Sequence, residues 1–380
     1  MDVLVVLVVA VLVGTGMGTA LLGSIKVPLA RKLAIDEARI GALVAMFGFT
    51  LIPVILTAGF VSDLLGRQPV TIAGALLFTI SLALFAQATA YWMVLVAVLL
   101  LSAGWGTLIN VVNPLSLIAF GGSQAYALNL GCFIFGIGSF VTPLGIAFLI
   151  RRLGLRGAVM LLSLSGIVMA VLACAATFPP VAPAASQVAA ATPGLGTLLG
   201  DAVMWLCALA LFFYMPAEAT MAAWATTYVT DKGMEEGAAA ALLSAFWLAY
   251  TAARLVAALT VPKGSEAAVV LVLSLVALVV WAGVVMCRAR GLAAALVIAV
   301  GVVFGPLYPT LLAVLLGHFE PALHGRAIGV FFTLGGLGCT AIPMLIGAYA
   351  KRRGVQRGFL LAAASTAGLC VVALLLALRA

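Results

Sequence analysis

Three charged residues stand inside long apolar stretches of the sequence, and their types set what chemistry the chain could do. Glu218 lies in FFYMPAEATMAAW, Lys26 in LLGSIKVP and Arg254 in AYTAARLVAAL. A charge at the centre of a membrane span costs roughly 2.5–3.5 kcal/mol on insertion scales, so each of these residues requires a compensating role. A carboxylate such as Glu218 can accept hydrogen bonds from a polar solute, or it can take up and release a proton. The alternatives for Glu218 are a structural ion pair and a partner for the helix kink at Pro216.

The composition is that of an integral membrane protein. Of the 380 residues, 66% are hydrophobic and only 8% are charged, with a mean hydropathy of +1.31. A soluble domain keeps about a quarter of its residues charged. The net charge of +8 comes from basic residues that stand in short stretches between apolar runs. We therefore expect an all-α protein in a lipid bilayer and no nucleic-acid partner.

Residues for catalysis, metal binding or cofactor binding are not arranged in any recognisable pattern. The six cysteines lie in apolar runs without a C-x-x-C pattern or a nearby histidine, which is typical of small core residues. His318 and His324 flank a short loop, and no Ser-His-Asp set or phosphate-binding loop appears. The sequence therefore predicts no enzyme, no metal and no cofactor.

Membrane spans can be counted from the apolar runs, because a helical span needs about 20 such residues. Twelve spans are predicted, the first being a span rather than a signal peptide. They lie at about 3–29, 39–61, 69–88, 91–118, 125–150, 157–177, 200–229, 237–261, 267–287, 291–316, 325–349 and 357–378.

A linker divides these spans into two equal sets. Residues 178–199 carry four prolines, many small residues and no charge, a composition typical of a connecting segment. The predicted domains are an N-terminal six-helix bundle at 1–177, the central linker at 178–199 and a C-terminal six-helix bundle at 200–380.

The two sets also repeat each other at an offset of about 200 residues. The pattern Gly-x-Gly-x4-Pro, followed by Arg-x-Gly, occurs over 136–154 and again over 336–354. Residues 35–47 and 234–246 match in the same way. The repeat predicts two pseudo-symmetric bundles of six helices that run in the same direction.

The turn between the second and third spans carries the most specific motif. Residues 59–68 read GFVSDLLGRQ, with the order Gly59-x-x-x-Asp63-x-x-Gly66-Arg67. Asp63 and Arg67 are four residues apart, close enough to face each other in a helical turn. The motif resembles the loop 2–3 signature of the major facilitator superfamily, although Gln68 stands where that family usually has a second basic residue. Parallel six-span repeats are also a feature of this superfamily.

The resemblance implies a conformational switch at Gly59, Asp63, Gly66 and Arg67. In the family the aspartate meets the positive N-terminal end of span 11, which here begins near Gly325. This contact would hold the halves together on the cytoplasmic side in the outward-open state. These residues would then control conformation and would not bind solute.

The resemblance also suggests roles for the other two buried charges. Spans 1 and 7 face each other across the cavity of this fold, so Lys26 could pair with Glu218 as an outer gate or a charge relay. The alternative is that Lys26 extends its ammonium group to the nearby interface. Arg254 is expected to brace spans 8 and 11, with a solute contact as the alternative.

Short motifs are similar to those of the fucose–proton symporter branch of the superfamily. They include Asn113-Pro114, the Leu128-Asn129 pair before the G-x-G-x4-P span, and Phe246-Trp247 in span 8. The resemblance implies a neutral sugar, since amide and carboxylate acceptors with aromatic rings complement hydroxyl groups and C–H faces. Asn113 and Asn129 could instead join helices by hydrogen bonds. The substrate-binding residues expected on this basis are Glu218, Trp224, Tyr228, Asn110, Asn113, Trp247, Tyr250 and Tyr308.

The chain departs from that branch at the residues used for proton coupling. The proton symporters of the branch have an acidic residue in span 1 and another in span 4, just ahead of the Asn-Pro pair. This chain has Lys26 in span 1, and Ile109 and Asn110 in span 4. Either Glu218 carries the coupling proton, or the protein is an uncoupled facilitator, or it carries another solute.

The sequence thus predicts a secondary active or facilitative transporter that works by alternating access, binds its solute at the midplane and acts as a monomer. The expected solute is a neutral sugar or similar small polar molecule, with H⁺ as a possible second solute. One alternative is an exporter of amphipathic drugs or lipids. An alternative of another class is a non-transporting receptor on the same fold, which would not need to retain the switch motif.

The resemblance places the protein in the cell inner (plasma) membrane with both termini in the cytoplasm. The distribution of basic residues disagrees with this orientation. In it, even-numbered loops face the cytoplasm and carry only Arg67, Lys263 and Arg326, while thirteen basic residues lie in odd-numbered loops. The positive-inside rule favours the opposite orientation. We follow the resemblance, because the repeat extends over the whole chain.

Overall fold

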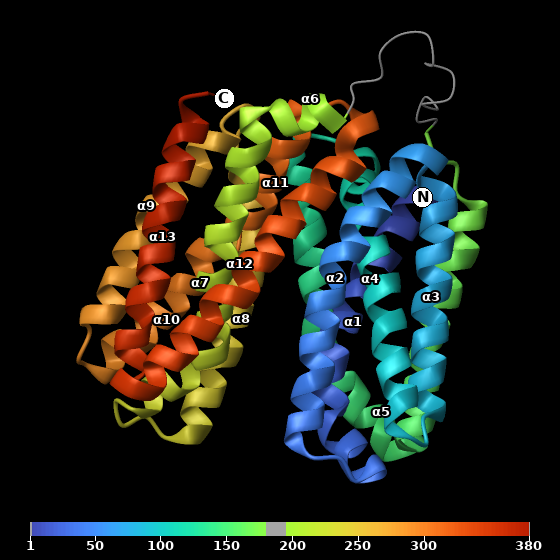
Figure 1. The fold of residues 1–380 in the computed structure, drawn as a ribbon, viewed down its shortest axis with the longest axis horizontal. Coiled ribbons are helices and arrows are strands. Elements are labelled where there is room, and N and C mark those ends of the chain that lie inside the picture. Colours follow the sequence, from blue (N-terminus) through green and yellow to red (C-terminus); the bar gives the residue numbers. More distant parts are fainter. Residues whose placement is uncertain (1, 180–194, 380) are drawn as a thin grey trace. The chain divides into compact units, whose positions relative to one another are not determined.

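The computed structural model describes residues 2–179 and 195–379. Within these residues the secondary structure consists of helices and contains no strands. The described helices are α1 Val3–Leu33, α2 Glu37–Leu65, α3 Arg67–Gln87, α4 Tyr91–Phe120, α5 Gln124–Ala175, α6 Leu195–Gly200, α7 Ala202–Thr230, α8 Glu236–Thr260, α9 Glu266–Met286, α10 Arg290–Phe304, α11 Leu307–His318, α12 His324–Arg353 and α13 Val355–Ala377 (Figure 1).

The helices account for the twelve predicted spans. The 52-residue α5 is too long for one crossing of a bilayer core about 30 Å thick, and it breaks at Gly154, whose φ is 69°. Its two parts are the fifth and sixth spans. Helices α10 and α11 together form one apolar span, Arg290–His318. With α12 counted as the eleventh span, the described residues form the all-α, twelve-span architecture.

Polar residues set several helix ends. Asp2, Asp36 and Asp201 are the N-caps of α1, α2 and α7, and each carboxylate accepts hydrogen bonds from the first backbone N–H groups of its helix. Gly66 separates α2 from α3 with a φ of 86°, a backbone conformation that other residues rarely adopt. Pro306 lies between α10 and α11, where it removes one backbone donor.

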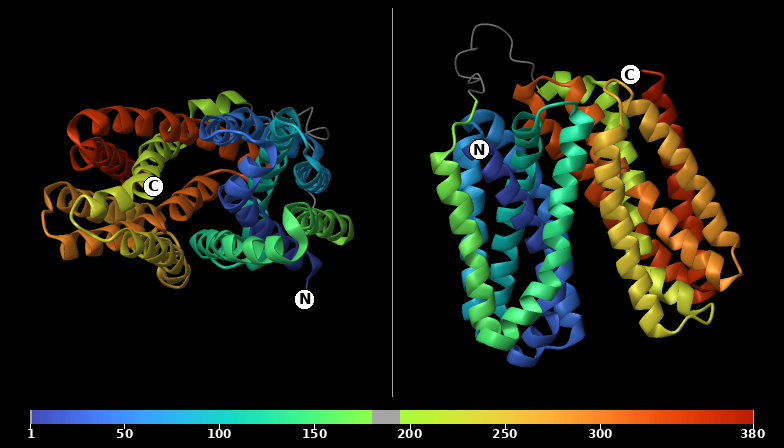
Figure 2. Two further views of the ribbon diagram at one scale, coloured as in Figure 1. Left: turned by 90° about the horizontal axis from the view of Figure 1, so that it is seen from below. Right: turned by 180° about the vertical axis from the view of Figure 1, so that it is seen from behind.

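The helices divide into two compact units. Unit 1 contains residues 1–121, 134–194 and 320–329, and unit 2 contains residues 122–133, 195–319 and 330–380. In unit 1, α4 packs against α1, α2 and α3. In unit 2, α13 packs against α7 and α9, while α10 packs against α8 and α9 (Figures 1 and 2).

The units differ from the predicted domains in two segments. The start of α5, residues 122–133, is grouped with unit 2, and residues 320–329, which include the start of α12, are grouped with unit 1. The predicted division at 178–199 stays a prediction. Most of that linker, residues 180–194, lies outside the described part of the chain, and its end forms α6.

Candidate functional site

Asp63 receives three hydrogen bonds at the start of α12, within unit 1. Its Oδ1 accepts from the Gly325 backbone N–H at 3.1 Å. Its Oδ2 accepts from the backbone N–H and from the Nε of Arg326, both at 3.0 Å. The Asp63 side chain is 3% exposed. It therefore caps the N-terminus of α12, where unsatisfied N–H groups and the helix dipole both favour a negative charge.

Arg67 and Asn110 reach the same segment of the chain. Arg67 donates from Nη2 to the Pro321 carbonyl at 2.9 Å. Asn110 donates from Nδ2 to the Gly325 carbonyl at 3.1 Å and to the Ile55 carbonyl at 3.2 Å. Although Asp63 and Arg67 are close in sequence, no ion pair joins these two described residues; each binds a different part of 321–326. The structure therefore groups Asn110, expected to bind solute, with the switch residues.

Gly59 allows α2 to approach the start of α12 closely. A Cβ atom at Gly59 would overlap the Gly325 carbonyl oxygen. In return, a Cβ atom at Gly325 would lie 2.6 Å from Asp63 Oδ1 and from the Gly59 carbonyl oxygen. Gly59 of the motif and Gly325 of α12 thus bring two backbones together, and the Asp63 carboxylate caps α12 at the same place.

A second polar cluster lies in unit 2, around the half-buried Glu218 of α7. The Tyr250 hydroxyl of α8 donates to Glu218 Oε1 at 2.8 Å. The same hydroxyl lies 2.8 Å from the Tyr214 hydroxyl, and Tyr214 donates to the Phe304 carbonyl at 3.1 Å. Tyr214 and Tyr250 are 2% and 3% exposed. Both buried hydroxyl groups therefore have polar partners, as buried polar groups require.

Arg254 is held inside this cluster by three acceptors. Its Nε donates to the Gly305 carbonyl at 3.1 Å, its Nη1 to the Cys132 carbonyl at 3.1 Å, and its Nη2 to the Tyr250 hydroxyl at 2.8 Å. The described contacts therefore tie span 8 to the break in span 10 and to the start of α5, rather than to span 11 as the sequence suggested. The planar guanidinium can bridge these separate acceptors because its donors point in fixed, divergent directions.

The break between α10 and α11 borders this cluster. Gly305 and Pro306 separate the two helices in the middle of an apolar span. Two residues from other helices, Tyr214 and Arg254, supply hydrogen bonds to the carbonyls of Phe304 and Gly305. Discontinuous helices of this kind often form the binding sites of membrane transporters, because irregular backbone is tolerated in a membrane only where it is buried or lines a cavity.

Aromatic rings extend the cluster along α8. Trp247 is 37% exposed and contacts the Tyr250 ring edge-on, with ring centres 5.3 Å apart. Tyr308 is half-buried at the start of α11. Its ring stacks on the Phe331 ring, with the ring centres 6.4 Å apart. Trp224 is also half-buried, six residues beyond Glu218 on α7.

The two predicted asparagines of α4 and α5 bind protein groups. Asn113 is buried and donates to the Ile109 carbonyl of its own helix at 2.7 Å. Asn129 donates to the Ala125 carbonyl at 3.0 Å and to Thr310 Oγ1 at 3.1 Å. Asn129 therefore joins the start of α5 to α11.

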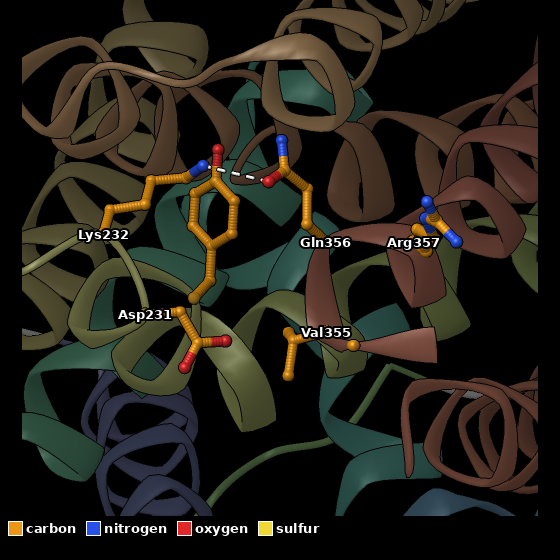
Figure 3. Close-up of a pocket in the computed structure, with 7 residues that line it drawn as sticks. Asp231, Lys232, Val355, Gln356 and Arg357 are labelled. Carbon is orange, nitrogen blue, oxygen red and sulfur yellow. Dashed lines mark hydrogen bonds between the residues drawn. The ribbon is translucent and has the colours of Figure 1, made fainter. Parts of the chain in front are cut away.

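Tyr228 lies at a distance from Glu218. It is ten residues further along α7, which is about 15 Å along the helix axis, and its hydroxyl donates to the Val284 carbonyl at 2.8 Å. It lines a separate pocket of about 220 Å³ with Asp231, Lys232 and residues 354–357 (Figure 3). Lys232 points toward Gln356 there and donates to its Oε1 at 3.0 Å. One small solute at Glu218 would not reach this pocket.

The predicted pairing of Lys26 with Glu218 involves the Lys26 side chain, which lies outside the part of the chain that the structure describes. Lys26 belongs to α1, but its side chain is not among those that the structure describes. The pairing therefore stays a prediction.

Tyr214 is a member of the cluster that the sequence analysis did not identify. It stands four residues before Glu218, on the same face of α7. That spacing is the signal that could have found it. The Phe304 and Gly305 carbonyls carry no such signal, because any residue provides a carbonyl and only the fold decides which ones lose their helical partners.

A protein family whose members share this architecture can be identified by comparing the chain with models of known families. The model of the Major Facilitator Superfamily matches residues 7–343. The chain belongs to the major facilitator superfamily. Its switch motif, its parallel repeat and its twelve spans are thus features of a superfamily of membrane transporters.

Solved structures of superfamily members share the fold. The E. coli fucose:proton symporter FucP, also solved in an outward conformation, gives a TM-score of 0.83 with 16% identity over 98% of both chains. The proton:xylose symporter XylE gives 0.79 with 13% identity over 98% of this chain and 94% of the other. The human organic anion transporter TETRAN gives 0.74 with 17% identity over 98% and 99%. At these identities the likeness shows the fold alone.

One curated relative is similar in sequence. Bypass of stop codon protein 6 of Saccharomyces cerevisiae is 31% identical over 177 residues, which is 44% of this chain. The match spans only 36% of the length of that relative.

Proposed function

We propose that this superfamily member transports a small neutral polar solute, most simply a sugar, by alternating access, and that Glu218 binds the solute or carries a coupling proton. The observation that carries the proposal is the cluster at the break in span 10. It combines a half-buried carboxylate, two phenols and a partly exposed tryptophan in one apolar unit.

The charges of the cluster favour a neutral solute over an anion. Glu218 carries the negative charge, and the cation beside it, Arg254, is occupied by two carbonyls and a phenol. An anionic solute would find no free cation among these described side chains and would be repelled by the carboxylate. A sugar offers hydroxyl donors to Glu218 and an apolar C–H face to Trp247.

Two features support transport over a purely sensory role. The capped start of α12 gives the switch motif a complete set of partners in unit 1, and α12 itself continues from unit 1 into unit 2. Release of Asp63 would free the end of a helix that belongs to both units. A receptor would not need to keep this arrangement.

Uptake into proteoliposomes tests the proposal. Purified protein would be offered a panel of radiolabelled hexoses and pentoses, with and without an inward proton gradient. We expect saturable uptake, concentrated against a gradient only when protons flow inward, and loss of concentrative uptake in Glu218→Gln. Glu235→Gln is the matched control, because Glu235 is an exposed acid that caps no backbone group of α8 with its side chain.

Other outcomes point to other functions. Saturable uptake that ignores the gradient and survives Glu218→Gln would overturn proton coupling and leave a facilitator. A complete absence of uptake for every sugar would overturn the neutral-sugar proposal. It would favour the export of amphipathic cations, which an acid in aromatic surroundings would also suit.

A further inference from the structure

Three polar contacts form a row from Glu218 to the end of α10, all within unit 2. They are Glu218 Oε1 to the Tyr250 hydroxyl at 2.8 Å, the Tyr250 hydroxyl to the Tyr214 hydroxyl at 2.8 Å, and the Tyr214 hydroxyl to the Phe304 carbonyl at 3.1 Å. Each contact needs one proton to become a hydrogen bond. The row therefore needs three protons.

The two phenols supply only two of these protons. A tyrosine hydroxyl has one proton to donate, and a carbonyl oxygen has none. Arg254 donates to the Tyr250 oxygen at 2.8 Å, but this bond lies beside the row and fills none of its three contacts. While Glu218 is ionised, at most two of the three contacts can hold a hydrogen bond. The third proton can come only from Glu218 itself.

In the ionised row, only the hydrogen bond between Tyr250 and Glu218 has a fixed direction. Tyr250 donates to the charged Glu218, as expected for a charge-assisted bond, and accepts from Arg254. Tyr214 can then donate either to Tyr250 or to the Phe304 carbonyl, but not to both.

The protonated row runs the other way. The Glu218 O–H donates to the Tyr250 oxygen, Tyr250 donates to Tyr214, and Tyr214 donates to the Phe304 carbonyl. Every contact is then filled, and Tyr250 still accepts from Arg254, within the two-acceptor capacity of a hydroxyl oxygen. The carboxylate gains one proton from the aqueous phase, and no other covalent bond is made or broken; only the hydrogen bonds change.

We propose that uptake of a proton by Glu218 reverses the Glu218–Tyr250 hydrogen bond and thereby fills all three contacts of the row, so that Tyr250 donates to Tyr214 and Tyr214 donates to the Phe304 carbonyl alone. This inference rests on the proposed role of Glu218 as the proton-carrying group. Phe304 is the last residue of α10, next to the Gly305–Pro306 break. The protonation state of Glu218 on α7 therefore affects the hydrogen bonding of the Phe304 carbonyl, at the break in span 10.

Other titratable groups near Glu218 do not replace it as the source of the proton. They are Tyr214 on its own helix, Tyr250 and Arg254 on α8, Cys132 on α5 and Cys339 on α12. From α10 the facing groups are the carbonyls of Phe304 and Gly305. Arg254 stays charged throughout, and neither thiol belongs to the row.

Infrared difference spectroscopy of the purified protein in lipid, without solute, tests the reversal. Acidification should produce a protonated-carboxyl band that is absent in Glu218→Gln. The same step should shift the bands of ring-labelled tyrosine, since the Tyr250 hydroxyl changes its acceptor from Glu218 to Tyr214. A carboxyl band without any tyrosine response would overturn the inference.

Tyr214→Phe tests the proton count. The variant removes two of three hydrogen bonds from the protonated row but only one of two from the ionised row. The midpoint of the carboxyl band should therefore move to lower pH, by up to about one unit for one net hydrogen bond. Tyr228→Phe is the matched control, because it removes another buried hydroxyl of α7 that lies outside the row, and its midpoint should stay in place. An unchanged midpoint in Tyr214→Phe overturns the inference.

Glu218→Gln gives an independent reading that does not depend on Tyr214→Phe folding correctly. A glutamine amide can donate to Tyr250 as the protonated acid does. At neutral pH this variant should show the tyrosine bands of the acidified wild-type protein, without further change on acidification. Bands like those of the neutral wild type would contradict the reversal. A reversal without sugar uptake would instead refute the proposed solute and leave the row intact.

Discussion

At the scale of single residues, Asp63 is the clearest case of a side chain whose charge and shape are both used. Its two oxygens accept three hydrogen bonds at the start of α12, and its carboxylate is almost fully buried. This arrangement requires a side chain whose two terminal atoms are both hydrogen-bond acceptors, as in a carboxylate. An amide of the same shape has one donor group and one acceptor oxygen, and so it fits only part of it.

Asp63→Asn should therefore abolish uptake while the protein still folds. The amide group must face at least one N–H of Gly325 or Arg326, which leaves buried donors unpaired at a cost of about 1–3 kcal/mol. We expect at least a tenfold fall in the initial uptake rate, measured in proteoliposomes with protein content matched by immunoblot.

Asp36→Asn is the control for this change on the same helix. Asp36 caps the start of α2 and accepts from the Arg39 backbone N–H at 2.9 Å, and asparagine caps helices about as well as aspartate. Its uptake should equal that of the wild type. Normal uptake in Asp63→Asn would remove the switch from the proposed mechanism and revive the receptor alternative.

The residues of the two clusters were predictable to different degrees. The motif at 59–67 could be identified because its glycines, acid and base occupy fixed spacings. Glu218 and Arg254 could be found because isolated charges in apolar runs are costly. Their partners could not, since the Cys132, Phe304 and Gly305 carbonyls become acceptors only through packing. Tyr228 was placed with Glu218 by proximity in sequence, yet ten helical residues separate them along α7.

At the scale of elements, a polar contact joins the start of α7 to the end of α11, where these two spans end. Asp201 accepts from the Val203 and Met204 backbone N–H groups at 2.7 and 3.2 Å and contacts His318 Nε2 at 2.9 Å. Partial burial acts to raise the pKa of Asp201, but the hydrogen bonds from His318 and from the two N–H groups outweigh it. The pKa of Asp201 is therefore lowered.

This contact should stabilise unit 2 in a pH-dependent way. A lowered pKa means that the contribution of Asp201 is complete above its unfolded pKa of about 3.9 and is lost as the pH falls through the lower folded value. Asp201→Ala should cost about 1 kcal/mol at pH 7, as expected for the loss of an N-cap. The difference from the wild type should shrink below about pH 4.

Thermal unfolding in detergent across pH 3–8 would measure this difference. His318→Gln separates the two parts of the contact, because it removes the imidazole and leaves the helix cap in place. It should give a smaller loss than Asp201→Ala. Equal melting temperatures for Asp201→Ala and the wild type at pH 7 would contradict the assignment.

Helix interruptions were harder to predict than the helices themselves. The apolar runs gave each span, because length and composition suffice for that. The break at Gly305–Pro306 was not predicted, since a proline inside an apolar run can also be accommodated in a continuous helix, as Pro216 is in α7. The break at Gly305–Pro306 differs from the continuous helix at Pro216 because Tyr214 and Arg254 donate hydrogen bonds to the Phe304 and Gly305 carbonyls.

At the scale of the whole molecule, the sequence repeat has a direct physical counterpart in each unit. In unit 1, a Cβ atom at Gly138 of α5 would overlap the Val13 carbonyl of α1; in unit 2, one at Gly338 of α12 would overlap the Phe212 carbonyl of α7. The repeated Gly-x-Gly pattern thus marks equivalent close helix contacts about 200 residues apart. This is why the division into two matching halves could be predicted from the repeated glycine positions without any alignment, once the apolar runs had given the spans.

The orientation of the molecule in its membrane sets two sequence signals against each other. Thirteen basic residues lie in odd-numbered loops, and the positive-inside rule alone places those loops in the cytoplasm. The switch motif instead favours a cytoplasmic position for the turn at Gly66. In that turn Arg67 is bound to the Pro321 carbonyl, and near it Arg326 is paired with Asp63. These two cations are retained by contacts within unit 1, so their number does not report on orientation.

We predict that both termini face the cytoplasm, as the superfamily membership and the switch motif favour. A fluorescent protein that matures only in the cytoplasm should therefore be bright when it is fused after Ala380, and alkaline phosphatase at the same place should be inactive. The reciprocal pair, fused within the loop after Gly233, should give the opposite result, which controls for expression. Active phosphatase at the C-terminus would reverse this topology. It would mean that the basic residues of the odd-numbered loops decide the insertion of this chain.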